Sequence, residues 1–295
     1  MKHFIMTHFN LKLWRVDKQN QPTQTNEWLE RRFQLFEEFC LPSVAAQSDK
    51  NFYWFCMFDI DTPNIYRKRI EAYKKIVPQM VPLFMTQDEA IKDDDKYLKD
   101  QIKKRLDADD KVLVTSQLDN DDAIHSDFVK DINNLAKNES AQDAFYIFKY
   151  GYQYYTEADF LLKIYYPNNH FPARMEKDLT DFKLVLSISH SHLRKKSLRE
   201  KIKVVKVDNK HKPLWVEVIH SKNVSNDVRL TFRPKEFFHF TKFRSLLPNF
   251  SWNEFGINRI FAKNKQLWKL FTFYYPRTFS KVLKKIHVKF NPITQ

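Results

Sequence analysis

Three carboxylates end an apolar run near the middle of the chain. Residues 111–124 read KVLVTSQLDNDDAI, so Asp119, Asp121 and Asp122 follow the pattern of a buried strand. Carboxylates this close repel one another unless water or a cation neutralises them. Oxygen ligands at short spacing on a tight turn suit Mg²⁺ or Mn²⁺. The motif therefore predicts a divalent metal site, and the competing interpretation is a solvated turn that caps the following helix.

A second acidic pair, Asp59 and Asp61 in FDIDTP, invites a different interpretation. Phosphatases of the haloacid dehalogenase class carry D-x-D-x-T at a strand end and a later pair of magnesium-binding acids, for which Asp121 and Asp122 would serve. However, Thr62 stands one place too early for that motif. Asp59 at a strand end would otherwise bind a nucleotide or cap the next helix.

Alternating strand-like and helix-like segments must position these acids. Strand patterns are expected over residues 2–9, 51–59, 79–86, 111–119, 144–155, 160–167, 182–190 and 213–220. Helical spacing of apolar residues is expected over 26–44, 62–77, 95–106 and 126–136. This order predicts an α/β fold with a mostly parallel sheet and helices on both faces. Ligands bind such sheets beyond the carboxyl ends of the strands, where both acidic groups fall.

Composition limits the function classes. The chain has 295 residues, including 27 Phe, which is enough for one large core. Its only glycines, Gly151 and Gly256, exclude a P-loop and a G-x-G-x-x-G fingerprint. A bound nucleotide would therefore be held by side chains and metal. The formal net charge of +14 favours an anionic partner without choosing among nucleic acid, phosphorylated substrate and membrane.

Cysteine content and hydropathy indicate the compartment. The two cysteines, Cys40 and Cys56, lie in apolar stretches, which excludes a disulfide framework and indicates a reducing, cytosolic setting. The first residues have no sustained apolar segment, so no secretory signal is expected. No apolar run approaches the roughly 20 residues that span a bilayer.

Four ordered blocks resemble one known family. They are WLERRFQLFEEFCLPSVAAQ, FYWFCMFDIDTP, TSQLDNDDAIHSDFV and PLWVEVIHSKNVSN. Together they are similar to the bacterial glycosyltransferases known as the putative rhamnosyltransferase family, over most of residues 1–230. The resemblance implies a GT-A catalytic domain, here expected over 1–233. The pattern from about Arg233 onward separately predicts a helical, basic and aromatic segment over 234–295. The resemblance also implies metal-dependent transfer of a sugar from a nucleotide-diphosphate donor to a glycan or lipid-linked acceptor, with rhamnose suggested only by the family label.

The resemblance assigns roles within the acidic cluster. Asp121 is the first choice for the metal, Asp119 is shared between metal and donor ribose, and Asp122 orients the site. His220 would be the imidazole ligand of the metal, with His190 a weaker competitor. Asp59 would accept hydrogen bonds from the base or ribose of the nucleotide. Each of these residues could instead be an ordinary hydrogen-bonded polar group.

Other positions complete or weaken this assignment. An inverting transfer needs a general base, for which Glu176, expected in a loop, is the candidate and Asp178 or Asp181 the alternative. Arg174 in the same segment would pair with phosphate. The family usually has Arg where this chain has Gln117, which removes a cation that could contact the donor phosphates. It often has Gly at the position of Ser221.

Two basic, aromatic segments suggest further partners. Residues 194–206 and the C-terminal tail have the composition of phosphate-contacting and base-stacking surfaces, so a nucleic-acid-binding protein is an alternative. The tail over 263–285 would equally suit an anionic membrane carrying lipid-linked acceptors. A peripheral place on the inner face of a membrane is then expected. The competing interpretation is that the tail aromatics pack on the catalytic domain.

Overall fold

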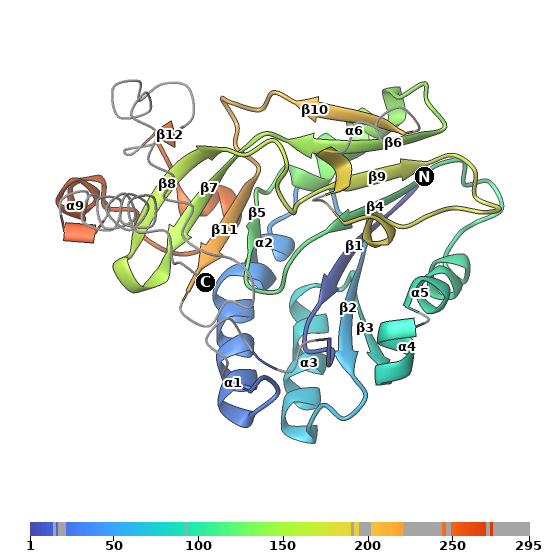
Figure 1. Cartoon of the computed structure of the whole chain (residues 1–295), viewed down its shortest axis with the longest axis horizontal. Helices are drawn as coiled ribbons and strands as arrows, with labels where there is room; N and C mark the ends of the chain where they lie inside the picture. Colours follow the sequence, from blue (N-terminus) through green and yellow to red (C-terminus); the bar gives the residue numbers. More distant parts are fainter. Residues whose placement is uncertain are drawn as a thin grey trace, which may run out of the picture.

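The computed structural model describes most of the chain. The described residues are 1–13, 16, 22–92, 94–189, 192–194, 202–220, 244–245, 249–269 and 272–273. Within them the chain forms two β-sheets flanked by helices (Figure 1). The helices are α1 (Asn26–Leu35), α2 (Leu41–Ala45), α3 (Asn64–Ile76), α4 (Gln87–Lys92), α5 (Asp94–Lys103), α6 (Phe128–Asn138) and α9 (Lys263–Lys269). A π-helical turn over Phe36–Cys40 joins α1 to α2.

The larger sheet is mostly parallel, as the sequence predicts. Its order is β10-β6-β9-β4-β1-β2-β3, and only β9 runs antiparallel to its neighbours β4 and β6. Its strands are β1 (Lys2–His8), β2 (Tyr53–Asp59), β3 (Met80–Met85), β4 (Leu113–Gln117), β6 (Asp143–Phe148), β9 (Ala173–Glu176) and β10 (Lys203–Val207). The mixed α/β fold with a mostly parallel sheet is therefore confirmed.

A smaller sheet lies beside the larger one (Figure 1). Its order is β12-β8-β7-β11-β5, with β5 (Ala123–Ile124), β7 (Tyr150–Tyr155), β8 (Phe160–Tyr165), β11 (Trp215–Ile219) and β12 (Arg244–Ser245). Gly151 of β7 lies so close to β11 that a Cβ atom there would be 2.0 Å from the Trp215 ring. Glycine is therefore required where these two strands meet.

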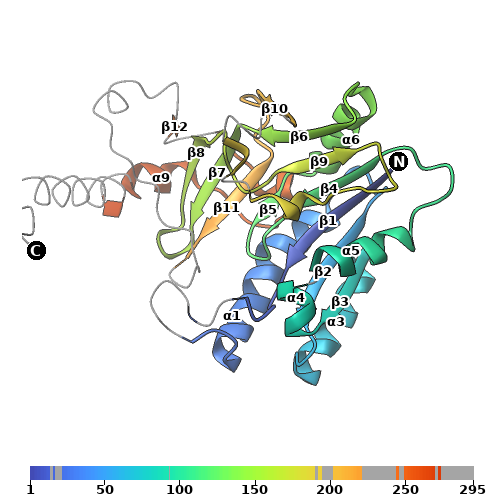
Figure 2. The same ribbon diagram turned by 45° about the vertical axis from the view of Figure 1, so that its right-hand side comes forward.

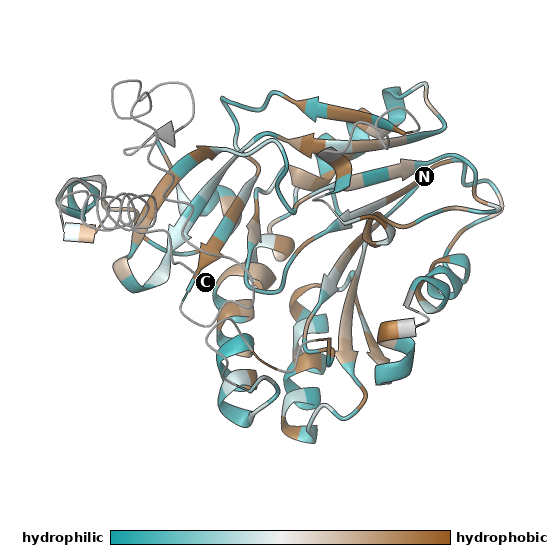
Figure 3. Ribbon diagram, in the orientation of Figure 1, coloured by the Kyte–Doolittle hydropathy of each residue, from teal (hydrophilic) through white to brown (hydrophobic). Residues whose placement is uncertain are grey.

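Alternating side chains of β1 and β2 cover the two faces of the larger sheet with separate cores. Ile5 and Trp54 pack with residues of α1 and α3, whereas Phe4 and Phe55 pack with residues of α5. Figure 2 shows α4 and α5 on one side of β2 and β3, with α3 on the other. Apolar colour follows these strands, and the outer faces of the helices are polar (Figure 3).

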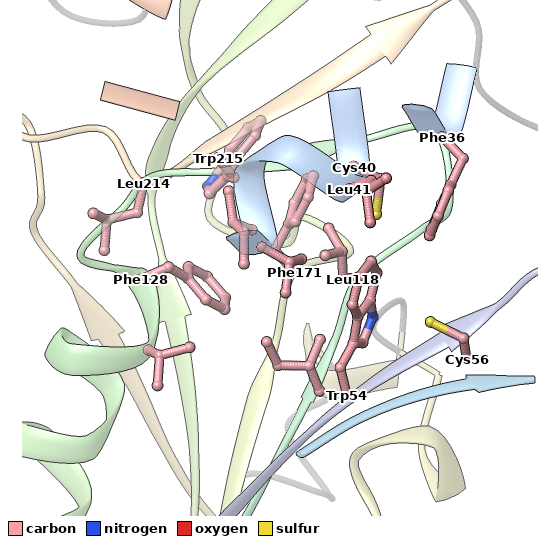
Figure 4. Close-up of a cluster of buried hydrophobic side chains, with 14 of the residues drawn as sticks. Phe36, Cys40, Leu41, Trp54, Cys56, Leu118, Phe128, Phe171, Leu214 and Trp215 are labelled. Carbon is pink, nitrogen blue, oxygen red and sulfur yellow. The ribbon is translucent and has the colours of Figure 1, made fainter. Parts of the chain in front are cut away.

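The first of these cores extends to the smaller sheet. Figure 4 shows Trp54 of β2, Leu118 after β4 and Phe171 before β9 in one cluster with Trp215 of β11. Cys40 and Cys56 are both buried and free. The two sheets therefore share apolar side chains at the place where the acidic cluster follows β4.

Two of the expected strands differ from the sequence-based prediction. Residues 144–155, expected as one strand, are split at Lys149 into β6 and β7 of different sheets. Residues 182–190, expected as a strand, contain a 3₁₀ turn over Val185–Ser187 instead. The Val185 N–H donates to the Thr115 hydroxyl, so this apolar run packs over the sheet face and does not join the sheet.

The described part of the C-terminal segment packs on the smaller sheet. Trp252 and Phe255 lie in one apolar cluster with Leu35 and Phe39. In α9, the Gln266 amide accepts a hydrogen bond from the Leu161 N–H and donates one to the Asp159 carbonyl just before β8. The expected boundary between residues 233 and 234 lies outside the described residues. Of the helices that the structure describes, none has the length and apolar character needed to cross a bilayer.

Candidate functional site

The expected acids gather where the two sheets meet. The parallel register of β1, β2 and β4 places their carboxyl ends at one edge. Asp59 ends β2, and the Asp119–Asp122 group connects β4 of the larger sheet to β5 of the smaller one, beside α1 (Figure 1). Asn120 ties this group to the end of β1, because its amide donates to the Phe9 carbonyl at 2.6 Å.

Asp121 is held by two cationic or hydrogen-bonding partners. Its Oδ2 accepts from Arg32 Nη1 at 2.9 Å and lies 2.9 Å from Nε2 of His220. All three side chains are buried. Burial opposes ionisation of Asp121, but Arg32 and His220 outweigh it and hold the pKa of this carboxyl well below its usual range. Asp121 is therefore an anion, and the expected meeting of Asp121 with His220 is present in the structure.

Asp122 forms a second carboxylate–imidazole pair beside the first. Its Oδ1 accepts the Val218 N–H at 2.8 Å, and its Oδ2 lies 2.7 Å from His170 Nε2. Burial opposes charge on both groups and raises the pKa of the Asp122 carboxyl, but the hydrogen bond between them outweighs burial at His170 and raises the pKa of that imidazole. Asp119 is 41% exposed, and its Oδ2 lies 3.9 Å from the same imidazole nitrogen.

Two sets of residues could thus hold a cation. Asp119, Asp122 and His170 offer ligand atoms within 4.8 Å of one another. Asp121 and His220 offer a neighbouring pair, but Arg32 already contacts that carboxylate. Both sets combine carboxylate oxygen with imidazole nitrogen, which are ligands for Mn²⁺ and similar divalent cations.

Arg32 and His170 were not among the residues expected from the sequence. Arg32 follows Trp28 by one helical turn on the buried face of α1, and its guanidinium lies 5.1 Å from the Trp28 ring. A charged residue on an apolar helix face is a signal that could have identified it. His170 lies in the loop before β9, where the sequence NNHFP carries no comparable signal.

Asp59 lies at the expected edge of the sheet, but nearby residues already contact its carboxylate. It is buried, its Oδ1 accepts the Asp61 N–H at 2.8 Å, and Lys12 Nζ lies 3.2 Å from the same oxygen. The Thr62 hydroxyl donates to the Asp59 carbonyl at 2.6 Å in the turn before α3. These contacts suit a carboxylate that shapes its own turn, and they do not favour the exposed nucleophile of the phosphatase interpretation.

Glu176 and Arg174 are not brought to the acidic cluster. They lie on β9 and not in a loop, so that prediction is wrong. Glu176 pairs with Leu113, at the end of β4 opposite to the cluster. Arg174 binds Asp143 through Nε and Nη2 at 3.0 and 2.6 Å, and its Nη2 lies 2.8 Å from Glu176. This buried arginine stabilises the sheet, and its donors are not directed at a phosphate site.

The alternative bases are no nearer. Asp178 and Asp181 follow Glu176 away from the cluster, and the Asp178 carboxylate accepts from Thr180 in its own turn. His190 and most of the basic segment 194–206 lie outside the described residues. In the tail, Trp268 is 71% exposed, whereas Phe273 is buried against Tyr155.

The burial of Glu176 should make the stability of the protein depend on pH. Burial, partly offset by Arg174, raises the pKa of its carboxyl to about 7. The folded protein therefore binds this proton more tightly than the unfolded chain, and stability falls as the pH rises from about 4.5 to about 7. Glu176→Gln should remove this loss, so urea unfolding midpoints change less with pH than those of the wild type. Nucleotide binding should be unchanged, and weaker binding would contradict the position described here.

The fold and the acidic cluster together define a class of protein. The protein is an α/β protein whose candidate ligand site lies at the carboxyl ends of parallel strands and contains carboxylates and imidazoles. Residues 9–231 match the family described as "Putative rhamnosyl transferase". The chain belongs to this glycosyltransferase family. No curated protein matches the sequence.

Solved structures show weaker similarity. S. aureus TarS 1-349 in complex with UDP-GlcNAc aligns with 95% of this chain and 75% of its own, at 12% identity and a TM-score of 0.41. S. aureus TarS aligns with 74% of this chain at 12% identity and a TM-score of 0.40, and the match spans only 37% of TarS. A nucleoside-diphosphate-sugar pyrophosphorylase from Vibrio cholerae covers 74% and 92%, at 12% identity and a TM-score of 0.28. Similarities this low assign no role to individual residues.

Proposed function

We propose that this protein transfers a sugar, with inversion, from a nucleotide-diphosphate donor to a hydroxyl of a glycan or lipid-linked acceptor. The observation that carries the proposal is the acidic cluster itself. In a member of a sugar-transferase family, Asp119, Asp121 and Asp122 meet two histidines at the carboxyl edge of a parallel sheet. Donor sugar, nucleotide and acceptor are not specified by these residues, and rhamnose comes from the family description alone.

The residues present fit a divalent cation. Asp121 Oδ2 and His220 Nε2 are 2.9 Å apart, which is close to the separation of neighbouring ligands on one cation with bonds of about 2.1 Å. Asp119, the exposed member, would share the cation with the donor ribose. Asp122 would orient the site through His170 and the Val218 N–H. When bound, Mn²⁺ or Mg²⁺ would neutralise charge on the departing diphosphate.

A specific observation favours a second ligand set. Asp119, Asp122 and His170 offer three ligand atoms in a small volume without displacing an arginine. Against this set, Asp122 is fully buried and both of its oxygens already have partners. We therefore assign the cation to Asp121 and His220 with Asp119, and the histidine variants in the Discussion distinguish the two sets.

Cations for the donor phosphates would come from the first helix. The position before the acidic cluster holds Gln117, whose amide donates only a long contact of 3.4 Å to Asp119. Arg32 of α1 instead brings a guanidinium to Asn120 and Asp121. Asp59 would remain at the nucleotide end of the site, where Lys12 lies beside it.

A donor panel tests the proposal. Melting temperatures of the full chain would be measured with dTDP-rhamnose, UDP-GlcNAc, UDP and dTDP, each with and without Mn²⁺. At least one nucleotide diphosphate should raise the melting temperature, and the increase should require the cation, because a ligand that binds only the folded state stabilises it. If none of these nucleotides raises the melting temperature, with or without Mn²⁺, the proposal of a nucleotide-sugar transferase is contradicted.

Contact of the tail with a membrane is a separate part of the proposal. The exposed Trp268 and the basic residues around it would suit an anionic surface, whereas Lys269 is engaged by Asp159 at 2.9 Å. Sedimentation with anionic and neutral liposomes decides the matter. If equal amounts of protein sediment with anionic and with neutral liposomes at low salt, contact of the tail with an anionic membrane is ruled out.

A further inference from the structure

One arginine lies where a cation on the acidic cluster would have to bind. Asp121 Oδ2 accepts from Arg32 Nη1 at 2.9 Å and lies 2.9 Å from His220 Nε2, so both partners contact the same carboxylate oxygen. Arg32 Nη1 also donates to Asn120 Oδ1 at 3.0 Å. A cation held by Asp121 and His220 would therefore meet the guanidinium on the oxygen that it needs.

The surroundings of Arg32 leave part of its guanidinium available. Of the arginines that the structure describes, it is the one that contacts the Asp119–Asp122 group. Its Nε and Nη2 groups have no hydrogen-bond partner among the described residues, and its side chain is 10% exposed. The centre of the Trp28 ring, one helical turn earlier on α1, lies 5.1 Å from the guanidinium carbon. Such a contact with a ring face keeps the positive charge beside the cluster.

Two positive charges on one carboxylate oxygen repel each other. Arg32, Asp121 and His220 are all buried, so little water would screen the repulsion between a divalent ion and the guanidinium. The guanidinium must therefore move when a cation binds to Asp121. A nucleoside diphosphate bound at the same edge would offer it a new partner, since the planar fork of an arginine matches phosphate oxygens.

We propose that Arg32 exchanges partners during donor binding. It pairs with Asp121 in the metal-free protein, and it turns to the donor diphosphate when a cation replaces it on Asp121. This inference rests on the proposed transferase function and deepens it. The exchange gives the buried carboxylate a cationic partner in both states, which avoids the cost of an unpaired buried charge.

The exchange should make the site bind metal and nucleotide together. Mn²⁺ alone must displace the guanidinium from Asp121, whereas Mn²⁺ with a nucleoside diphosphate gives the displaced guanidinium a new partner. Each ligand should therefore tighten the binding of the other, and by the same factor, as thermodynamic linkage requires.

Two variants of Arg32 and one control test the exchange in the full chain. Arg32→Gln removes the competing charge, whereas Arg32→Lys keeps a positive charge but loses the planar fork. Arg31→Gln changes the preceding arginine of α1, for which the structure describes no contact with the acids. Binding of Mn²⁺ alone would be measured by electron paramagnetic resonance of the free ion. Binding of UDP and dTDP, with Mn²⁺ and with a chelator, would be measured by calorimetry.

The exchange predicts opposite changes for the two ligands. Arg32→Gln should bind Mn²⁺ alone about tenfold more tightly than the wild type, which is an ordinary size for coupling between two ligands. In Mn²⁺ it should bind UDP or dTDP at least about tenfold more weakly, because hydrogen bonds to a charged group are lost. Arg32→Lys keeps Asp121 paired, so it provides a test even if Arg32→Gln does not fold. It should weaken nucleotide binding while its Mn²⁺ affinity stays near that of the wild type and of Arg31→Gln.

Three results would overturn the exchange. Arg32→Gln could bind Mn²⁺ no more tightly than the wild type, or both Arg32 variants could bind nucleotide as the wild type does. The wild type could also bind nucleotide equally with Mn²⁺ and with a chelator, which would make Arg32 a permanent cation on Asp121. A wild type that binds neither UDP nor dTDP would overturn the proposed function itself. The manganese measurement uses no nucleotide, so tighter Mn²⁺ binding by Arg32→Gln would still establish the competition at Asp121.

Discussion

Replacing His220 with glutamine should abolish the manganese dependence of nucleotide binding. His220 Nε2 lies 2.9 Å from the Asp121 carboxylate, at the end of β11 and across from β4. Glutamine keeps a polar side chain there but removes the imidazole ligand. Loss of outer partners of a metal site alone weakens binding about 10–100-fold, so loss of a ligand should weaken it at least 100-fold. Calorimetry with UDP or dTDP, with and without Mn²⁺, measures the effect.

Two matched histidine variants make this result specific. His170→Gln removes the partner of Asp122 and, with the cation on Asp121 and His220, should weaken binding far less. His211→Gln changes an exposed histidine away from the cluster and should have no effect. If His170→Gln eliminates manganese-dependent binding and His220→Gln does not, the cation belongs to Asp119, Asp122 and His170. If neither variant matters, no cation binds at this cluster.

Asp121→Asn should destabilise the protein even without any metal. The sequence suggests the opposite, since removing one of three neighbouring carboxylates would relieve repulsion. In the structure, however, Asp121 is the partner of buried Arg32. Removing one member of a buried ion pair leaves the other charge unpaired and costs about 3–5 kcal/mol. Chemical denaturation in the presence of a chelator measures the change in unfolding free energy.

A surface ion pair provides the control for this measurement. Asp131 contacts Lys212 at 2.7 Å, but the two side chains are 25% and 43% exposed, so Asp131→Asn should cost no more than about 1 kcal/mol. If both variants lower the unfolding free energy by the same amount, the buried charge of Arg32 is not stabilised by Asp121. A more stable Asp121→Asn protein would restore the repulsion argument.

Periodicity and strand order predicted the parts of the fold that local sequence determines. Buried strands ending in acids, and amphipathic helices between them, are visible in single segments of the chain. The division of residues 144–155 between two sheets was not visible in the sequence, because Tyr150–Tyr155 has the same aromatic character as the preceding strand. Which sheet a strand joins depends on distant partners such as Trp215, whose ring requires the missing side chain of Gly151.

The candidate site was likewise predictable from the sequence only in part. The carboxyl-edge position of Asp59 and of the acidic cluster followed from the parallel order, whereas the approach of His220 was expected only from the family resemblance. Glu176 was placed wrongly because β9 runs antiparallel, which a four-residue strand does not reveal, and a reversed strand carries its end to the opposite edge. Arg32 and His170 reach the cluster only through tertiary packing.

The chain passes from one sheet to the other at the acidic cluster, and this has a thermodynamic consequence. Asp121 follows the larger sheet and His220 ends a strand of the smaller one, 99 residues later. A cation shared by these two side chains would close a long loop of the chain, and closures of long loops restrict the unfolded ensemble most. The metal would then act as a cross-link between the sheets as well as a partner for phosphate. Removing the metal should weaken the contact between the two sheets before either sheet unfolds.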